Sequence, residues 1–381
     1  MGLLKIYYWR SKKSLQSLLI LTRKLIKNIK TSMRQTELLI SLSNLENNLN
    51  ILRNKTQSSI QAVVKANAYG LTYEEVLAVT ENYVESYSVI TLDEAIQLRK
   101  LTNKPVLMLQ GVHEENDYKQ VQEHRLDFVV HSFWQIENLN KFYVGNSSIW
   151  LKINTGMNRL GFDRDDFFRY YDFINTLNSR EVVLMSHLAA SNDIENPQNN
   201  YQIDTFTELT KDKDNRKSLA NSGGIFNFQK SHFDVVRPGI AIYGGGGRFL
   251  EHGLKPVTKL RSKIISKRRV KKNDPIGYDG LWKADVDTTI CYVPIGYADG
   301  IPYFTFQKDV QINGKNFKTV GKVNMDLIAI NIGDDESIKV GDWVDFWGFD
   351  TDIGKLSKEF NTISYQLLTN LSGRVAKNYL E

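Results

Sequence analysis

The stretch QAVVKANAYG, residues 61–70, places a lysine directly at the end of an apolar run. The residues Ala-Val-Val at 62–64 predict a buried β-strand, because short apolar runs with β-branched residues are typical of strands covered on both faces. Lys65 follows without a turn, and the polar, helix-like segment 73–84 completes a strand-then-helix unit. Any fold assigned to this sequence must therefore place an amine at the end of a buried strand.

The same strand-then-helix unit recurs from about residue 38 to residue 240. Polar, helix-like segments separate apolar runs at 38–42, 61–66, 87–91, 105–109, 127–131, 148–154, 182–189 and 232–239. This alternation predicts a parallel α/β fold, and about eight such units close into a (β/α)8 barrel. An open, doubly wound sheet is the alternative. No Gly-x-Gly-x-x-Gly turn opens the first unit, so a dinucleotide site has little support.

The pattern changes after about residue 255. Short strands there are separated by Asn-Gly, Gly-Asp and Asp-Gly pairs, and the segment INGKN at 312–316 predicts a hairpin. We therefore expect an N-terminal barrel over residues 33–255 and a mostly β domain over 256–381, preceded by a basic extension over 1–32. A chain of 381 residues suits two domains.

Composition and charge narrow the class of protein. The chain is 41% hydrophobic and 24% charged, which is typical of globular proteins. Its net charge of +6 comes from residues 1–32, which carry eight Lys or Arg and no acid. The remainder has 41 basic against 43 acidic side chains, so nucleic acid is not an expected partner. Cys291 is the single cysteine, which excludes an internal disulfide and favours a reducing, cytoplasmic location.

The basic extension has three interpretations. Its apolar residues fall near helical spacing, but the run is far shorter than the ~20 residues that span a bilayer, and no small-residue cleavage site follows. Met33 is the true start of the protein in the first interpretation. In the second, the segment is an amphipathic helix that binds a membrane surface, and in the third it is a benign or targeting extension. No integral membrane segment is expected.

Several chemically active side chains fall at predicted strand ends, where parallel barrels place their active sites. They are Lys65, Lys152, Arg159 and His187, with the loops NSGG at 221–224 and RPGI at 237–240. Each alone is more often structural, as a solvated lysine or a core histidine. Together they supply an amine, an imidazole, an anion-binding loop and a guanidinium. That set fits pyridoxal phosphate, which needs a Schiff-base lysine, a phosphate cradle and a group facing its pyridine nitrogen; no bound metal is expected.

Nine motifs in order resemble the alanine racemase family. They are AVVKANAYG, ITLDEAIQLR, LKINTGMNRLGF, SHLAAS, NSGG, VRPGIAIYG, PIGYADG, VGKVNMD and TISYQLL, and they run from about Arg34 to the C-terminus. The resemblance implies a pyridoxal 5'-phosphate-dependent isomerase that works as a homodimer. It would interconvert L-alanine and D-alanine, and in a bacterium its product would supply peptidoglycan synthesis.

The resemblance also implies roles for single residues. Lys65 matches the cofactor-bound lysine, Arg237 the arginine on the pyridine nitrogen and His187 the histidine beside the cofactor ring. The phosphate contacts correspond to Tyr69, Ser222, Gly239, Ile240 and Tyr365. The substrate side corresponds to Arg159 and the Met325 backbone for the carboxylate, Tyr278 as second catalytic residue, Tyr297 at the access path and Lys152 as a lysine carbamylated in several relatives. Tyr278 and Met325 would come from the partner subunit.

The chemistry accounts for these residue types. Racemisation removes the α-proton from one face and returns it on the other, which two bases on opposite faces do directly. Tyr278, with a reference pKa of about 10, needs nearby positive charge to act as one of them. A guanidinium at Arg237 cannot accept a proton, so the pyridine nitrogen stays neutral. That suits a racemase, whereas a decarboxylase on this fold would be expected to place an acid there.

Five positions depart from the family pattern. Leu71 and Thr72 stand where His-Gly is frequent, Asn154 replaces an Asp, Lys322 an Arg, and Asn324 a small residue, whereas Asp326 keeps its place. Asn154 changes the charge near Lys152, which weakens the expectation of carbamylation. The alternatives are a racemase of another small amino acid such as serine, a non-racemase pyridoxal phosphate-binding barrel protein, and a decarboxylase.

Overall fold

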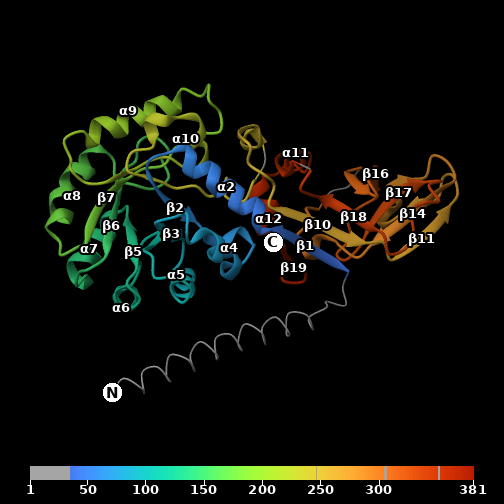
Figure 1. Ribbon diagram of the computed structural model, residues 1–381, viewed down its shortest axis with the longest axis horizontal. Coiled ribbons are helices and arrows are strands. Elements are labelled where there is room, and N and C mark those ends of the chain that lie inside the picture. The colour runs from blue at the N-terminus through green and yellow to red at the C-terminus, as the bar shows by residue number, and fades with distance from the viewer. Residues whose placement is uncertain (1–34, 246, 304–306, 351) are drawn as a thin grey trace, which may run out of the picture.

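The computed structural model describes residues 35–245, 247–303, 307–350 and 352–381. It consists of an eight-stranded parallel sheet curved into a nearly closed barrel, and a nine-stranded sheet beside it (Figure 1). The predicted fold class, a barrel followed by a mostly β domain, is confirmed. The predictions for residues 1–32 and for Met33 lie outside the described residues. No helix in the described ranges is long and apolar enough to cross a membrane.

The barrel strands follow one another around the sheet, and helices cover its outer face. The strands are β2 (Ser59–Val63), β3 (Ser86–Val89), β4 (Val106–Met108), β5 (Asp127–Val130), β6 (Ser148–Lys152), β7 (Glu181–Met185), β8 (Lys217–Ser218) and β9 (Val235–Val236). The helices are α2 (Leu42–Lys55), α4 (Tyr73–Thr80), α5 (Leu92–Arg99), α6 (Glu115–Glu123), α7 (Phe133–Phe142), α8 (Arg164–Thr176), α9 (Gln198–Thr210) and α10 (Ser222–Asn227). β9 returns to pair with β2, and a bridge between Asn221 and Arg237 spans β8 and β9.

Strand alternation explains how polar residues reach the barrel mouth. The barrel interior holds a separate apolar cluster that includes Trp150, Met185 and Val235. Successive side chains of a strand point to opposite faces, so the residue two positions on faces inward again. Two positions after these three apolar residues come Lys152, His187 and Arg237. The apolar layer thus fixes the face on which the polar groups emerge.

One strand assignment made from the sequence is wrong. The apolar run 38–42 was placed in the first barrel unit, but β1 (Thr36–Ser41) belongs to the nine-stranded sheet. It pairs antiparallel with β10 (Thr258–Lys263) and parallel with β19 (Ala376–Leu380). A short, largely apolar run suits either sheet, and its partners, more than 200 residues away, decide between them. The two-residue strand β8 completes the barrel instead.

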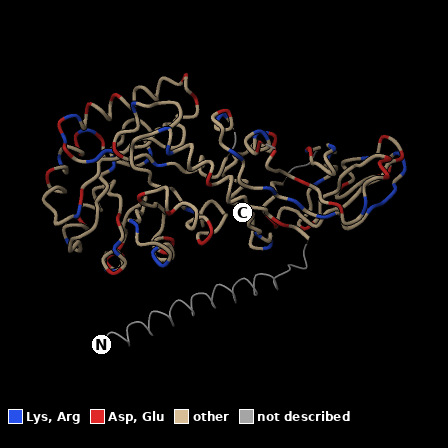
Figure 2. Tube along the Cα trace, viewed as in Figure 1, with Lys and Arg blue, Asp and Glu red and all other residues tan. Residues whose placement is uncertain are grey.

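The loops and short elements around the second sheet carry four of the candidate residues, Tyr278, Tyr297, Met325 and Tyr365. Its order is β11 (Ser266–Val270), β14 (Thr288–Val293), β17 (Ile328–Gly333), β16 (Lys315–Val320), β15 (Asp309–Ile312), β18 (Trp343–Trp347), β10, β1 and β19. The hairpin expected at 312–316 forms, with positive φ at Asn313 and Gly314. β1 lies toward the barrel and β11 at the far end (Figure 1). Basic and acidic residues are interspersed over both parts (Figure 2), as the near-neutral balance of the sequence predicts.

Candidate active site

Lys65 opens a left-handed turn at the end of β2. The four residues Ala66 to Tyr69 have φ of 54°, 52°, 54° and 55°. Non-glycine residues pay roughly 1–2 kcal/mol each for this conformation. The turn closes through Ala68 N–H to Val64 O and Gly70 N–H to Ala66 O, both at 2.8 Å. The small residues after the lysine thus allow a compact reversal that brings Tyr69 into the core.

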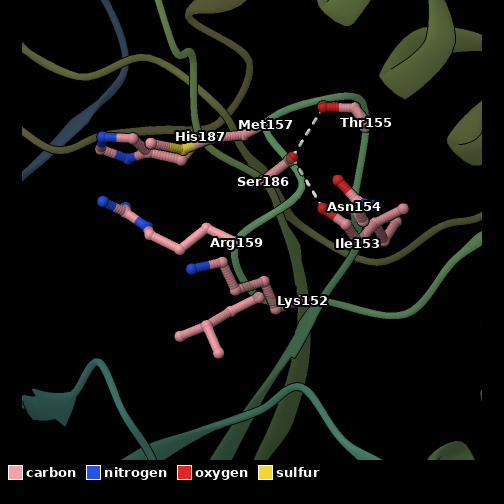
Figure 3. A pocket seen from close by; sticks show the side chains of 9 residues that line it. Lys152, Ile153, Asn154, Thr155, Met157, Arg159, Ser186 and His187 are labelled. Carbon is pink, nitrogen blue, oxygen red and sulfur yellow. Dashed lines mark hydrogen bonds between the residues drawn. The ribbon is translucent and has the colours of Figure 1, made fainter.

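Lys65 lies in a group of cations at the barrel mouth. Lys152 ends β6, Arg159 follows in the next loop, and both extend in the same direction as His187 (Figure 3). Burial, with Arg237, Arg159 and Lys65 nearby, lowers the pKa of Lys152 to about 8. Burial and Arg159 also lower the pKa of Lys65. The site therefore favours neutral amines.

His187 is held as a neutral imidazole. Burial lowers its pKa well below the ordinary value, and Arg237 adds to the effect. Asn221 places its Nδ2 3.4 Å from the His187 Nε2. The Asn221 Oδ1 already accepts from Gly224 N–H at 3.1 Å and from Ser191 Oγ at 2.6 Å. The Asn221 amide nitrogen consequently faces the ring as a donor, so Nε2 is the acceptor and Nδ1 carries the proton.

Arg237 is a buried cation with neutral partners. Its side chain follows β9 and is 3% exposed. The guanidinium donates to the Ser218 hydroxyl and to the carbonyls of Ser186 and Leu219. Within the described ranges no carboxylate forms an ion pair with it. Burial lowers its pKa to about 10, so it stays protonated at neutral pH.

A second cluster of polar groups, formed by two hydroxyls and two backbone N–H groups, surrounds Gly239. The Ser222 hydroxyl accepts from the N–H groups of Gly239 at 3.0 Å and Ala241 at 3.3 Å. The Tyr69 hydroxyl lies so close that a Cβ at Gly239 would be 2.3 Å from it. Only glycine permits this approach. Ile240, the neighbour of Gly239, is buried in the same turn.

Tyr69 is fixed by two further tyrosines. Its ring stacks on Tyr243 with centroids 4.5 Å apart and lies 6.0 Å from the ring of Tyr365. Tyr365 comes from α12 (Ser364–Thr369), near the C-terminus. Burial raises the pKa of Tyr365 to about 12, and burial with Tyr365 nearby raises that of Tyr69. Both hydroxyls are therefore neutral donors, which suits an anion such as a phosphate.

Three predicted site residues lie apart from this cluster. Tyr278 is 67% exposed, Met325 52% and Tyr297 41%. Tyr297 N–H donates to Asn324 O, and the next residue, Ala298, donates to Met325 O, both at 3.1 Å. These contacts bring Tyr297 and Met325 together on an exposed face of the β domain.

Tyr278 lies at the end of the second sheet that is remote from the barrel of its own chain. It lies between the short strands β12 (Pro275–Ile276) and β13 (Trp282–Lys283). Ile276 and Trp282 belong to a small core with Val270 of β11 and Ile290 of β14. Because β11 and β14 form the sheet end that is remote from the barrel (Figure 1), Tyr278 is separated from Lys65 of the same chain.

Three of the residues that depart from the family pattern have local side-chain partners. The Asn154 Nδ2 donates to Asn158 Oδ1 at 2.9 Å and Asp163 Oδ1 at 2.8 Å, so this amide faces α8 and not Lys152. Lys322 pairs with Asp279, beside Tyr278. Thr72, at a φ of 83°, bonds through its hydroxyl to Glu75 and Tyr379.

Two residues that contact the site were not singled out from the sequence. Asn221 was included only as part of a small-residue loop, and Glu94 only within the motif ITLDEAIQLR. Glu94 completes the capping box of Thr91 and also reaches Ala66 N–H at 2.7 Å. The capping-box pattern was visible in the sequence, but its contact with the Lys65 turn was not.

Comparisons with known proteins cover both parts of the chain. Residues 40–246 match the family "Alanine racemase, N-terminal domain" and residues 257–379 match "Alanine racemase, C-terminal domain". The alanine racemase of Mannheimia succiniciproducens is 36% identical over 92% of this chain and 100% of its own length. That of Shewanella oneidensis is 37% identical over 88% and 97%.

Solved structures agree with these matches. The biosynthetic alanine racemase of Pseudomonas aeruginosa superposes with a TM-score of 0.88 at 31% identity, covering 92% of this chain and 100% of that one. The alanine racemase of Bartonella henselae with covalently bound pyridoxal phosphate gives a TM-score of 0.83 at 28% identity, covering 91% and 99%. The family matches span nearly all of the described residues, and the chain therefore belongs to the alanine racemase family.

Proposed function

We propose that this protein is an alanine racemase that interconverts L-alanine and D-alanine with pyridoxal 5'-phosphate. The observation that carries the proposal is the cluster of Lys65, Lys152, Arg159, His187 and Arg237 at the mouth of a barrel that matches this family along its length. It is an enzyme of the isomerase class, and its product in a bacterium would enter peptidoglycan synthesis.

The residues present fit pyridoxal phosphate. Lys65 has no hydrogen-bond or ion-pair partner among the described residues, and its lowered pKa favours the neutral amine that bonds to an aldehyde. The Tyr69 hydroxyl and the Ser222–Gly239 turn form a cradle that a Cβ at Gly239 would fill. We assign the phosphate to this cradle, with Ile240 and Tyr365, and the pyridine nitrogen to Arg237.

The two bases would come from different subunits. When bound, pyridoxal phosphate acts as an electron sink that makes the α-proton of the amino acid removable. Lys65 holds the proton on one face, and Tyr278 of the partner subunit holds it on the other. Arg159 and the Met325 backbone of the partner subunit orient the substrate carboxylate, while the partner subunit's Tyr297 narrows the access path. The separation of Tyr278 from its own barrel supports a homodimer.

The environment of Arg237 argues against a decarboxylase. Its partners are a hydroxyl and two carbonyls, so no group there can keep the pyridine nitrogen protonated. The presence of the β domain with Tyr278 argues against a non-racemase barrel protein. We also propose a cytoplasmic location, on the basis of the single, buried Cys291.

Serine is a second candidate substrate. The side-chain oxygen of Asn324 is buried and has no hydrogen-bond partner among the described residues. Asn324 precedes Met325, whose backbone is assigned to the substrate. A substrate hydroxyl could satisfy this oxygen, whereas the methyl group of alanine could not.

Loss of the α-proton tests the proposed function. Full-length protein with pyridoxal phosphate in D2O is expected to exchange the α-proton of L-alanine and to form D-alanine, and protein beginning at Met33 should do the same. Lys65→Ala should lose both the exchange and the yellow colour of the bound cofactor. A panel of D- and L-amino acids then ranks alanine against serine. Exchange no faster than in a protein-free control would refute a racemase, and carbon dioxide release from basic amino acids would favour the decarboxylase.

A further inference from the structure

The carboxylate of Glu94 joins the ends of two neighbouring barrel strands. Its Oε1 accepts the N–H of Ala66 at 2.7 Å, and its Oε2 accepts the N–H groups of Ile90 at 2.9 Å and Thr91 at 3.4 Å. Ala66 directly follows Lys65 after β2, whereas Ile90 and Thr91 follow β3. Since β2 and β3 pair side by side, one side chain links the Lys65 turn to the adjacent strand end.

The contact with Ala66 falls at the start of the left-handed turn. The internal bonds of the turn use the N–H groups of Ala68 and Gly70, which leaves the Ala66 N–H directed outward. The carboxylate satisfies that donor. Four consecutive residues other than glycine keep a left-handed backbone conformation only when contacts with the surrounding structure hold them in it. Glu94 is therefore placed to fix the direction in which the chain leaves Lys65.

Glu94 also supplies negative charge to a cationic site. The titratable groups that face Lys65 are Arg159 and Lys152 from β6 and its loop, His187 after β7, and Glu94 in α5. Arg159 lowers the pKa of Lys65, while Glu94 raises it. Tyr73 of α4 also faces Glu94, and burial with this carboxylate nearby raises the Tyr73 pKa, so that phenol stays neutral.

We propose that Glu94 is a positioning residue for Lys65, which holds the turn through the Ala66 N–H and offsets the surrounding cations by its charge. This inference rests on the proposed function and deepens it. Glu94→Gln keeps the size of the side chain but removes its charge, and its amide nitrogen cannot accept from a backbone N–H. The Gln side chain cannot hold both strand ends as the carboxylate does.

The test measures Lys65 directly in cofactor-free, full-length protein. Reductive methylation of Lys65 is followed by peptide mass spectrometry from pH 6 to 10, and covalent capture of pyridoxal phosphate is followed by its visible absorbance. In Glu94→Gln the methylation midpoint should fall by about half a unit or more, because a carboxylate that favours the ammonium is lost. At a pH above both midpoints, where the amine is neutral in both proteins, capture should slow severalfold, because the turn no longer holds the amine in place.

Thr91→Ala is the matched control. It removes the hydroxyl that accepts Glu94 N–H at 3.3 Å and weakens the same helix start, but it leaves the carboxylate and its bond to Ala66. Its melting temperature should fall, whereas the methylation midpoint and capture rate should not change. Glu94→Asp keeps the charge but is one methylene too short, so capture should slow while the midpoint stays near that of the wild type.

The outcomes separate this proposal from the proposed function. Equal midpoints and capture rates in Glu94→Gln and wild type overturn the role of Glu94, and so does a Thr91→Ala variant that shifts them as much. If Glu94→Gln does not fold, a Glu94→Asp capture rate equal to that of Thr91→Ala overturns it. A wild-type protein that captures no pyridoxal phosphate refutes the cofactor assignment, while the methylation midpoints still decide the effect of Glu94 on Lys65.

Discussion

At the residue scale, the barrel mouth concentrates positive charge with little to balance it. Lys65, Lys152, Arg159 and Arg237 approach one another, and Arg237 has only neutral acceptors among the described residues. Burial of like charges makes the protonated amines unfavourable. The same crowding of positive charge lowers the pKa values of Lys65 and Lys152, and so favours their neutral, nucleophilic amines.

Lys152 is expected to take up carbon dioxide as a carbamate. Only the neutral amine reacts, and because the pKa is lowered from 10.5 to about 8, that form becomes abundant at pH 8 and declines as the pH falls. The product is an anion that would steady Arg159. The Asn154 side chain is bonded to Asp163 at the start of α8, so it does not occupy the space beside Arg159 that the carbamate would take.

Carbon-13 NMR with labelled bicarbonate checks the carbamate. A carbonyl signal should appear at pH 8–9, weaken toward pH 6 and vanish in Lys152→Ala. A signal that persists in Lys152→Ala, or none at pH 9, would contradict the assignment.

At the element scale, a short strand and a strained turn together present Lys65, the proposed cofactor lysine. Ser59 of β2 is in register with the interior residue Val235, so Val63, four positions on, shares its face, and Lys65 follows Val63 by two positions. The left-handed turn then returns the chain toward Gly239 at once. Its first three residues are alanine, asparagine and alanine, and none of its four residues is β-branched, the class of side chain for which this conformation is least favourable.

Ala66→Gly is expected to stabilise the protein. Ala66 is exposed with a φ of 54°, a conformation that glycine adopts freely, so the free energy of unfolding should rise by up to about 1 kcal/mol. The matched control is Ala78→Gly on the exposed face of α4. Glycine there should lower the free energy of unfolding by about 1 kcal/mol. Urea unfolding of both variants measures the difference. Destabilisation of the same size in both would argue against strain in the turn.

At the scale of the whole molecule, the two residues proposed as the catalytic pair are separated within one chain. Tyr278 is anchored at the β11 end of the second sheet, whereas Lys65 lies in the barrel. A second copy of the chain can bring such residues together. The active form is then expected to be a dimer with two shared sites.

Mixing inactive subunits tests the shared site. Lys65→Ala and Tyr278→Ala proteins should each be inactive, and after unfolding and refolding together they should recover about one quarter of the wild-type activity, since half of the dimers are mixed and each has one intact site. Tyr278→Phe should further impair proton removal from one enantiomer more than from the other. Activity of either parent at the wild-type level, or no recovery in a demonstrated mixed dimer, would rule out this arrangement.

Much of the fold was predictable because strand and helix periodicities are local. Repeated apolar runs identified seven of the eight barrel strands, and the positions of Lys65, Lys152 and His187 at strand ends were visible in the same pattern. The strand β8, with two residues, was too short to leave such a signal. β1 was misplaced because an apolar run does not identify its partner.

The sequence by itself determined the class of fold and the order of candidate groups along the barrel, since both follow from residue type and from a period of two along a strand, and its resemblance to the alanine racemase family singled out Lys65 as the candidate cofactor lysine. Only the tertiary structure decided the left-handed turn after Lys65, the contact of Glu94 with Ala66, and the distance of Tyr278 from its own barrel. These features depend on hydrogen bonds and packing between segments far apart in the chain. Local periodicity carries no information about which segments meet.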